Sequence, residues 1–255
     1  MSSEALYLLH TKPDPQRLAG WAARHRLLDG HGDLGYALHA LLNAAFGEHA
    51  PQPFRYLDAE QGLLAYTRLS AAELAQCAAL ADLDVAAALG LSQTLHHAGL
   101  SARPFPSQWA AGHMLGFEVR VRPINREGKT GRERDAFLSA EEKAVGSELV
   151  RSEVYVQWLR ELLVRQGGAE LVDAIVTRYQ LLGVTRKTQK DGPGDARHSR
   201  VVSGPDVVLT GQLRVADPQA FAQLLAGGVG RHRAFGFGLL LLRSTKGYCA
   251  RVINA

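Results

Sequence analysis

The order of predicted strands and helices is the feature that most constrains how this 255-residue chain can fold. Segments with alternating apolar residues, typical of strands, are separated by segments whose apolar residues recur every three to four positions, as in helices. Each half of the chain follows the order strand, helix, strand, strand, helix, strand, and the first half has one extra helix. The length suits two modest hydrophobic cores, so each half can form its own compact unit.

The first half contains strands and helices over most of its first 90 residues. Asp33 is expected to cap its second helix, and Ser70 and Glu73 have the spacing of a capping box. The stretch after Leu89 is rich in proline and glycine and is ambiguous, so we expect the boundary between the halves there. The expected elements are a strand at Ala5–Thr11, helices at Asp14–Leu28, Asp33–Phe46 and Ser70–Leu89, and two strands around a turn in Pro53–Leu69.

The second half begins with an alternating strand and continues through a polar loop into a long helical stretch, which Gly146 could interrupt. Near its end, Asp217 and Pro218 have the arrangement of a helix cap followed by proline in the first turn. The expected elements are strands at Met114–Asn125, Ile175–Thr188, Asp206–Val215 and Gly238–Ser244, and helices at Ser139–Gln166 and Asp217–Gly228.

The repeated order of elements is that of the ferredoxin-like fold, which is also the order of the RNA-recognition sheet. We therefore predict an α+β protein with two tandem ferredoxin-like (RRM-like, βαββαβ) domains and extra helical insertions. The N-terminal domain would cover residues 1–110 and the C-terminal domain residues 111–255. The two halves show no obvious sequence identity, so the repeat is one of architecture.

Composition and charge indicate the class of protein and of partner. Hydrophobic residues make up 46% and charged residues 21%, which is typical of a soluble globular protein. The net charge of +4 and the pI of about 9.2 are compatible with a polyanionic partner. Two distant cysteines, Cys77 and Cys249, indicate no disulfide framework, so we expect a reducing, cytoplasmic setting. The N-terminus does not resemble a signal peptide, and no stretch reaches the roughly 18 apolar residues of a membrane span, so we expect no membrane partner.

The run "GGVGRHRAFGFGLLLL", from Gly227 to Leu242, lies between a predicted helix and a predicted strand. It is not a dinucleotide fingerprint, because Gly228 and Gly230 would require a glycine at Arg233, and the order of elements is reversed. The chain has no phosphate loop and no His-Glu-x-x-His motif, and its ten histidines show no metal-ligand spacing. We therefore expect no metal and no small-molecule cofactor.

Such a run can hold an anion. Glycines let main-chain N–H groups approach a ligand closely, and Arg231 and Arg233 can bind phosphate with two hydrogen bonds each. The alternative is an ordinary turn with solvated arginines. The candidate binding residues are Gly228, Gly230, Arg231, Arg233, Gly236 and Gly238.

The helix, the glycine-rich run and the leucine strand together resemble the C-terminal signature of the CRISPR-associated repeat-cleaving endoribonucleases, especially the CasE-like branch. In that family a G-[VI]-G-x-x-x-x-[FML]-G-x-G-L-L turn lies against RNA, and the fold is two tandem ferredoxin-like domains. The stretch "FEVRVRPIN" (Phe117–Asn125) resembles the strand that opens the family's second domain. The resemblance covers most of the second half and one helix of the first, and it implies a type I-E or type IV system.

That helix, Asp33–Phe46, carries the candidate catalytic residues. At about 100° per residue, its leucines share one face, whereas Tyr36, His39 and Asn43 lie on the opposite face. Many relatives have a Tyr-x-x-His on the first long helix, with the histidine as the main catalytic residue, and Tyr36 and His39 match it. The alternatives are a solvent-facing histidine and a surface aromatic residue. In the family this helix follows the first strand quickly, whereas here about twenty residues intervene.

RNA carries its own nucleophile, the 2′-hydroxyl, so cleavage needs no metal. The enzyme must align the 2′-oxygen with phosphorus, move protons and stabilise charge on the phosphate. Histidine suits the proton transfers because its ordinary pKa is about 6.5. The expected products are a 2′,3′-cyclic phosphate and a 5′-hydroxyl.

Further cationic residues are candidates for the site or for RNA binding, since some relatives rely on arginines more than on histidine. Arg24 and Arg243 are candidate catalytic residues, and Arg26 is a candidate RNA contact. The loop "NREGKTGRERD" leads into the long helix and could form an arm that grips RNA or a partner subunit. For this loop, and for the basic segment listed next, the alternative is a solvated charged loop. The other candidate RNA contacts lie in and around the loop between the second and third expected strands of the second half. They are Arg186, Lys187, Lys190, Arg197 and Arg200.

The resemblance implies a metal-independent endoribonuclease that cuts CRISPR precursor RNA within the repeat, next to a hairpin. It also implies that the protein stays on the hairpin end of the crRNA and joins the other subunits of a CRISPR effector complex. A non-catalytic subunit that binds the RNA hairpin is the main alternative. A general RNA-binding protein with tandem recognition sheets is disfavoured, because the predicted strands lack the aromatic pattern that stacks on bases.

Overall fold

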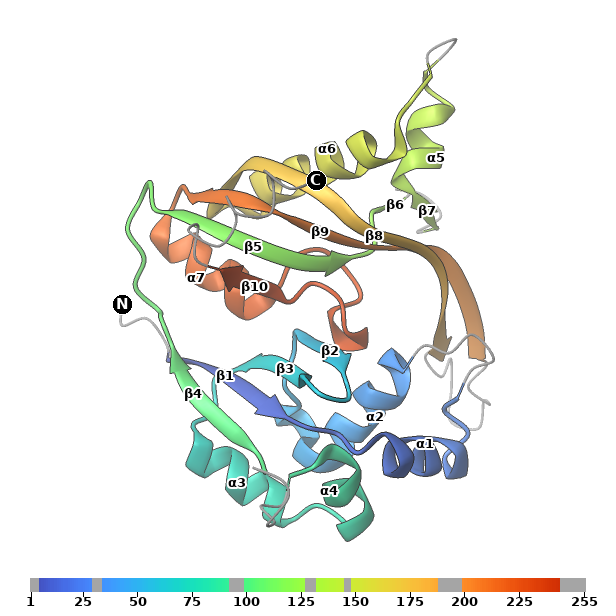
Figure 1. The fold of residues 1–255 in the computed structure, drawn as a ribbon, viewed down its shortest axis with the longest axis vertical. Coiled ribbons are helices and arrows are strands. Elements are labelled where there is room, and N and C mark those ends of the chain that lie inside the picture. The colour runs from blue at the N-terminus through green and yellow to red at the C-terminus, as the bar shows by residue number, and fades with distance from the viewer. Residues whose placement is uncertain are drawn as a thin grey trace, which may run out of the picture.

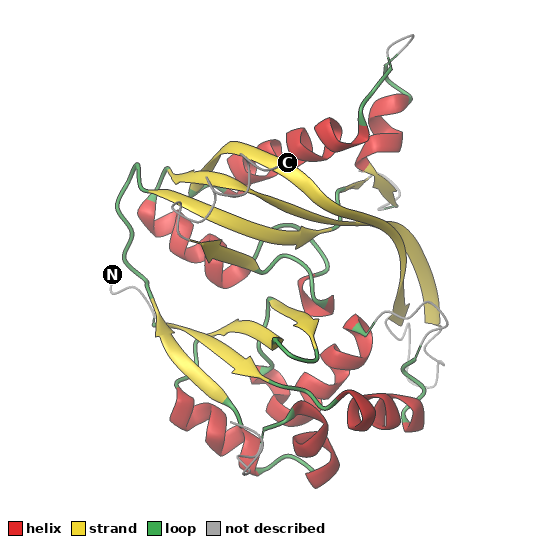
Figure 2. Ribbon diagram, viewed as in Figure 1, coloured by secondary structure: helices red, strands yellow, loops and turns green. Residues whose placement is uncertain are grey.

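The computed structural model of the protein describes residues 5–28, 34–91, 99–126, 132–144, 148–187 and 199–243. Two four-stranded antiparallel sheets, one from each half of the chain, form the centre of the molecule (Figure 1). Most helices lie outside this pair of sheets (Figure 2). None of the helices in the described ranges combines the length and the apolar character that crossing a bilayer requires.

The first sheet has the strand order β2-β3-β1-β4. Leucines of α2, including Leu38 and Leu41, pack beneath it against Leu9 and Leu63, so the predicted apolar face of this helix is the buried one. Its strands are β1 (Leu6–Thr11), β2 (Phe54–Asp58), β3 (Gly62–Thr67) and β4 (Ser101–Phe105), and its helices are α1 (Pro15–Arg24), α2 (Gly35–Phe46), η1 (Gly47–His49), α3 (Ala71–Ala79) and α4 (Leu83–Leu89).

The second sheet has the order β10-β5-β9-β8. Its strands are β5 (Met114–Val121), β8 (Ala169–Lys187), β9 (Ser199–Val215) and β10 (Leu240–Arg243). The other elements of this half are a small pair, β6 (Ile124–Arg126) and β7 (Glu133–Asp135), and the helices α5 (Ala136–Glu141), α6 (Arg151–Gln166), α7 (Pro218–Gly227) and η2 (Arg233–Phe235). Strands β8 and β9 extend well beyond the rest of the sheet, and their far end bends toward α2 (Figure 1).

Both sheets have the same topology, which confirms the predicted fold class. In each half the first strand lies between the third and the fourth, and the second strand is at the edge next to the third. This is the arrangement of a βαββαβ unit of ferredoxin-like type. The proposed domain boundary at residues 110 and 111 lies between β4, which closes the first sheet, and β5, which opens the second.

Local capping follows the sequence at several predicted points. Asp14 accepts hydrogen bonds from two backbone N–H groups at the start of α1, and Asp217 does the same for α7. Ser70 and Glu73 form the predicted reciprocal capping box. Asp33, the predicted cap of the second helix, lies outside the described residues; Leu34 precedes this helix and makes no side-chain cap hydrogen bond.

Two expected helices are each broken in two. The alanine-rich stretch Ser70–Leu89 forms α3 and α4, because the chain leaves the helix after Ala79 and extends at Asp82. Alanine favours helix on both sides of this break, so the periodicity does not show it. The stretch Ser139–Gln166 becomes the end of α5 and the whole of α6, with Gly146 between them outside the described residues.

Strands were also missed or misplaced. The ambiguous stretch after Leu89 contains β4, which pairs with β1 although its sequence includes Pro104. Strand β8 begins at Ala169 rather than Ile175. The end of the expected strand Met114–Asn125 becomes the separate strand β6, and the expected polar loop contributes its partner β7. These segments are strands because of their pairing partners rather than because of an alternating pattern.

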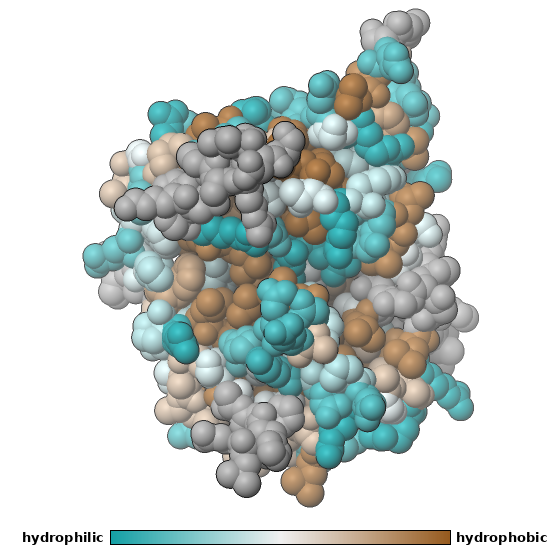
Figure 3. Space-filling view, viewed as in Figure 1, coloured by the Kyte–Doolittle hydropathy of each residue, from teal (hydrophilic) through white to brown (hydrophobic). Residues whose placement is uncertain are grey.

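The two halves are joined by specific contacts. The hydroxyl of Tyr66 in β3 donates a buried hydrogen bond to the carbonyl oxygen of Leu240 in β10, at 2.9 Å. Tyr66 and Leu6 belong to the same apolar cluster as the core of the second half. Apolar side chains also reach the surface where the halves meet (Figure 3). The glycine-rich run enters β10 directly, so its position relative to the first half is fixed by these contacts.

Candidate active site

Helix α2 presents Tyr36 and His39 on the side opposite its buried leucines. Both side chains are half-buried, and their ring centres are 6.4 Å apart. One turn later, Asn43 lies on the same side of the helix. The predicted neighbour relation of the three residues is therefore present in the fold.

The glycine-rich run meets this side of α2 through Phe235, the last residue of η2. The ring of Phe235 lies nearly parallel to that of Tyr36, with centres 6.0 Å apart. It meets the ring of His39 edge-on, at 5.3 Å. The fold therefore joins two candidate segments that are almost 200 residues apart in the sequence into one site.

The surroundings of His39 favour its neutral form. Burial lowers the pKa of His39 below the ordinary value of 6.5. The amide nitrogen of Asn43 lies 3.1 Å from Nδ1 of His39 and donates to the His39 carbonyl oxygen at 2.7 Å. Because an amide N–H can only donate, this contact is also better suited to an imidazole nitrogen that carries no proton. A neutral imidazole in this state carries its proton on Nε2, so it can accept a further proton at Nδ1 in exchange for the contact with Asn43.

The glycines of the run hold the run itself in place. The N–H of Gly238 donates to the carbonyl of Arg120 at 2.7 Å, that of Gly228 to Leu224 at 2.8 Å, and that of Gly230 to the side chain of Gln166 at 3.2 Å. In this structure those three N–H groups are engaged inside the protein. An anion would therefore have to be bound by other groups of the run.

Gly236 and Gly238 have left-handed backbones, with φ of +82° and +80°, but differ in the space around them. A Cβ at Gly238 would clash with the carbonyl oxygen of Val229, whereas one at Gly236 would meet its nearest atoms at 3.5 Å or more. We expect Gly236→Ala to lower the free energy of unfolding by about 1–2 kcal/mol, the cost of the left-handed backbone. Gly238→Ala should lower the free energy of unfolding by roughly 1–3 kcal/mol more than Gly236→Ala, because of the clash with Val229. Denaturant unfolding of both variants measures the difference, and equal losses would contradict it.

The cationic residues of the run have acidic or carbonyl partners from other elements. Arg231 donates through Nε to one carboxylate oxygen of Glu133 in β7 at 3.0 Å, and Nε2 of His232 lies 2.9 Å from the other. The guanidinium of Arg233 donates to the carbonyl of Gly227 at the end of α7. These contacts fix the backbone of the run, while the side chain of Arg231 stays 46% exposed and accessible to an anion.

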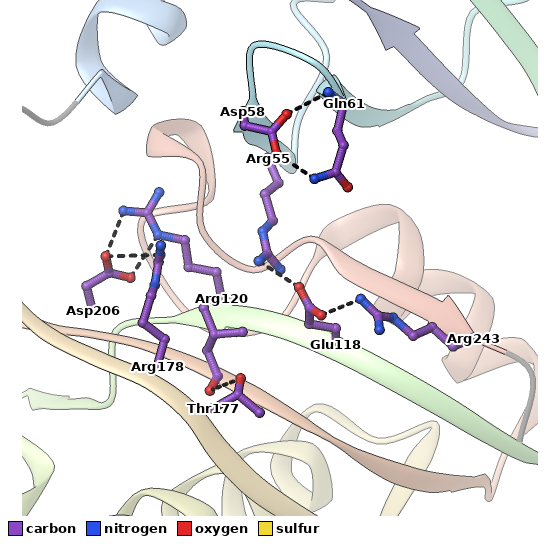
Figure 4. A network of polar contacts seen from close by, with 10 residues as sticks. Arg55, Asp58, Gln61, Glu118, Arg120, Thr177, Arg178, Asp206 and Arg243 are labelled. Carbon is purple, nitrogen blue, oxygen red and sulfur yellow. Dashed lines mark hydrogen bonds and ion pairs between the residues drawn. The ribbon is translucent and has the colours of Figure 1, made fainter. Parts of the chain in front are cut away.

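Arg243 belongs to a network of charged residues on β5, β9 and β2 (Figure 4). Glu118 accepts from Arg55 of β2 at 2.7 Å and from Arg243 of β10, so it links the two halves. Beside it, Arg120 donates two hydrogen bonds to Asp206, at 2.8 and 2.9 Å. Arg243 is thus placed in an ion pair within the second sheet, next to the inter-half pair of Arg55 and Glu118, rather than against Tyr36 or His39.

Asp206 is fully buried and ionised. Burial alone would raise its pKa, but hydrogen bonds and charge from Arg120, with further contributions from Gln180 and Arg178, hold the pKa below its ordinary value. Arg120 also lies over the ring of Phe237, 4.3 Å from its centre. The network therefore supports the glycine-rich run from below.

Arg24 and Arg26 are placed apart from this cluster. Arg24 pairs with Asp84 of α4 at 3.0 Å, and both side chains are exposed. Arg26 is exposed just after α1, with a left-handed φ of +54°. The contacts that fix these residues come from α1 and α4, not from Tyr36 or His39.

The basic segment between β8 and β9 is described only in part. The backbone register places Arg186 opposite Arg200 and Lys187 opposite Ser199, at the end of the pair that bends toward α2. Lys190 and Arg197 lie outside the described residues. Among the described residues, no group of three or more histidine, cysteine, aspartate or glutamate side chains is arranged to hold a metal ion.

Sequence reasoning missed the acidic partners and Phe235 as members of the site. Glu118, Glu133 and Asp206 come from three different strands, and no acidic residue follows Gly227 in the sequence itself. For Phe235 the only sequence signal is its place in the glycine-rich motif. Which ring the loop would meet depends on how the two halves pack.

Comparisons with known proteins agree with this architecture. The model of a family described as CRISPR associated protein matches residues 6–244. The CRISPR-associated endoribonuclease Cse3 of Thermus thermophilus is 31% identical over 144 residues, which are 54% of this chain and 59% of the relative, so the match spans less than two thirds of that relative.

Solved structures of Cse3 share the fold. Cse3 bound to a 19-nucleotide RNA has a TM-score of 0.61 at 22% identity, covering 95% of this chain and 100% of that one. Thermus thermophilus Cse3 bound to an RNA that represents a pre-cleavage complex has a TM-score of 0.57 at 21% identity, covering 94% and 99%. At these identities the likeness is one of fold.

Proposed function

The chain belongs to the family of CRISPR associated proteins, and we propose that it is a metal-independent endoribonuclease that cuts CRISPR precursor RNA within the repeat, beside a hairpin. It then remains on the crRNA as a subunit of an effector complex. The observation that carries this proposal is the contact of Phe235, from the glycine-rich run, with Tyr36 and His39 of α2. The relative Cse3 is an endoribonuclease by name, which supports the same reaction class.

The proposed reaction uses the 2′-hydroxyl of the RNA as nucleophile. Neutral His39 accepts its proton as the oxygen attacks phosphorus. The bond to the 5′-oxygen of the next nucleotide breaks, and that oxygen takes up a proton from the imidazolium or from water. The products are a 2′,3′-cyclic phosphate and a 5′-hydroxyl. Tyr36, next to His39, can donate a hydrogen bond to the phosphate, and Arg231 brings positive charge from the adjoining loop.

The β8–β9 pair is proposed to hold the RNA stem. The backbone register places Arg186 opposite Arg200, so two cationic positions are neighbours across the pair. Cationic residues contribute most of the affinity for phosphates, so this part of the pair suits a polyanion. Lys187, Lys190 and Arg197 add positive charge in the same stretch of the sequence.

A non-catalytic subunit that binds the hairpin is the second candidate. The contacts of His39 with Asn43 and Phe235 would serve packing alone in that case. Purified protein incubated with a transcript of its own CRISPR repeat in EDTA distinguishes the two. We expect cleavage at one position of the repeat. Tight binding without cleavage would leave the non-catalytic subunit as the function.

The pH dependence of cleavage tests the role of His39. Because burial lowers the pKa of His39, its neutral form persists to lower pH, and kcat/KM should be full at neutral pH and fall only below pH 6.5. Asn43→Asp puts a carboxylate beside the ring and should move this fall to higher pH. Asn43→Ala, the uncharged control, should leave the fall in kcat/KM below pH 6.5. A fall that is the same in all three proteins, or that persists in His39→Ala, would contradict the assignment.

A further inference from the structure

The two phenylalanines of the glycine-rich run have different environments. Phe237 is fully buried beneath Arg120, so it anchors the run to the second sheet. Phe235 is only half-buried, although it is among the most apolar residues of the run. Phe235 therefore stays partly accessible to solvent beside Tyr36 and His39.

The position of Phe235 is determined by residues on both sides of it. Its N–H donates to the carbonyl of His232 at 2.8 Å, and the turn lies between two left-handed residues, His232 with φ of +62° and Gly236 with φ of +82°. A left-handed backbone is unfavourable for histidine. It is maintained here because the imidazole is buried and lies 2.9 Å from the carboxylate of Glu133. Phe235 is thus held in place before any ligand arrives.

The rings of Phe235 and Tyr36 lie against each other next to the candidate catalytic histidine, and both side chains stay partly exposed. They are inclined by only 27°, whereas His39 meets Phe235 at 64°. Aromatic rings of this kind stack on nucleobases with little sequence preference, because every base has a π-face. Bases inside a helical stem already stack on their neighbours, so an unpaired or end base fits these rings best.

We propose that Phe235, with Tyr36, forms a stacking site for an unpaired nucleobase that flanks the scissile phosphate. Stacking would bring the sugar and phosphate of that nucleotide toward His39. The inference rests on the proposed endoribonuclease function and adds a substrate-binding residue to it. Phe235 takes no part in proton transfer, so its effect is on how the bound RNA is positioned.

The test compares Phe235→Leu with Phe235→Trp in single-turnover cleavage of the repeat RNA. Leucine keeps an apolar side chain but cannot stack, so we expect cleavage by the saturated complex to slow by about 5- to 150-fold, which is the free energy of one base–aromatic stack converted to a rate. Tryptophan should restore most of the rate. Denaturant unfolding of both variants checks that the fold is retained, and Phe237→Leu shows the result expected for a purely structural defect.

A substrate with an abasic nucleotide next to the cut separates stacking from packing. We expect Phe235→Leu to slow cleavage of the normal RNA but to have little further effect when the base just before or just after the cut is missing. The proposal would be overturned if Phe235→Leu slowed cleavage of the abasic RNA by the same factor as cleavage of the normal RNA. So would an unchanged rate, or a faster one, which would mean that Phe235 covers His39.

Binding of RNA with 2-aminopurine at the flanking position tests the stacking site without cleavage. Stacking should quench the fluorescence with wild-type protein and with Phe235→Trp, but not with Phe235→Leu. If wild-type protein binds the RNA and quenches but never cleaves it, the proposed function fails and the stacking site stands. If it cleaves without any quenching difference between the variants, the stacking site fails and the function stands.

Discussion

Replacing the 2′-hydroxyl at the cut site by hydrogen is expected to abolish cleavage and to leave RNA binding nearly unchanged. The proposed nucleophile belongs to the substrate, so without it His39 has no proton to accept and no bond to phosphorus can form. Binding loses at most one hydrogen bond, about 0.5–1.5 kcal/mol. Gel-based cleavage and a binding titration with the same RNA measure both quantities.

The control is an RNA with the same replacement at the nucleotide after the cut. That RNA keeps the nucleophile and should be cleaved at close to the normal rate. Cleavage of the first deoxy substrate would require water or another nucleophile and would exclude the mechanism proposed here.

His39→Ala should slow single-turnover cleavage by about 10²- to 10⁴-fold, the usual contribution of general acid–base catalysis. The affinity for RNA should change little, because a neutral imidazole contributes no charge to phosphate binding. Rates at saturating protein and a binding titration separate the two effects.

The chain offers a matched control in His25, an exposed histidine that packs on Trp21 at the end of α1. His25→Ala should cleave normally. If His39→Ala also cleaves at nearly the wild-type rate, His39 is structural, and Arg24, Arg26 and Arg243 become the residues to test. Arg24 and Arg243 would then have to act from their ion pairs with Asp84 and Glu118.

The sequence was sufficient to predict the fold because periodicity and element order act together. Alternating apolar residues mark β1, β5 and most of β9, and the βαββαβ order leaves few topologies for the sheets. What was missed depends on tertiary contacts. β4 is a strand because β1 pairs with it, and the break between α3 and α4 occurs within an alanine-rich stretch that favours helix throughout.

The site could be predicted only as separate pieces. Helical spacing alone placed Tyr36, His39 and Asn43 on one side of α2. The motif drew attention to the glycine-rich run, but it did not show that Phe235 meets α2. It also did not show that Arg231 pairs with Glu133, because such contacts depend on how the two halves pack.

The charge pattern of the run was misleading for the same reason. All charged residues from Gly227 onward are cationic, which suggested that the arginines are unpaired and available to an anion. In the fold, Glu133 and Glu118 come from other strands and lie beside Arg231 and Arg243. The exposed parts of Arg231 and Arg233 are what remain in the run for a phosphate.

The chemistry of the product ends tests the central claim most directly. Wild-type protein is incubated with its repeat RNA in EDTA, and the termini of both fragments are identified by mass spectrometry. The account predicts cleavage with a 2′,3′-cyclic phosphate on the upstream fragment and a 5′-hydroxyl on the downstream one. A 3′-hydroxyl with a 5′-phosphate, or activity that appears only when a divalent metal is added, would contradict it.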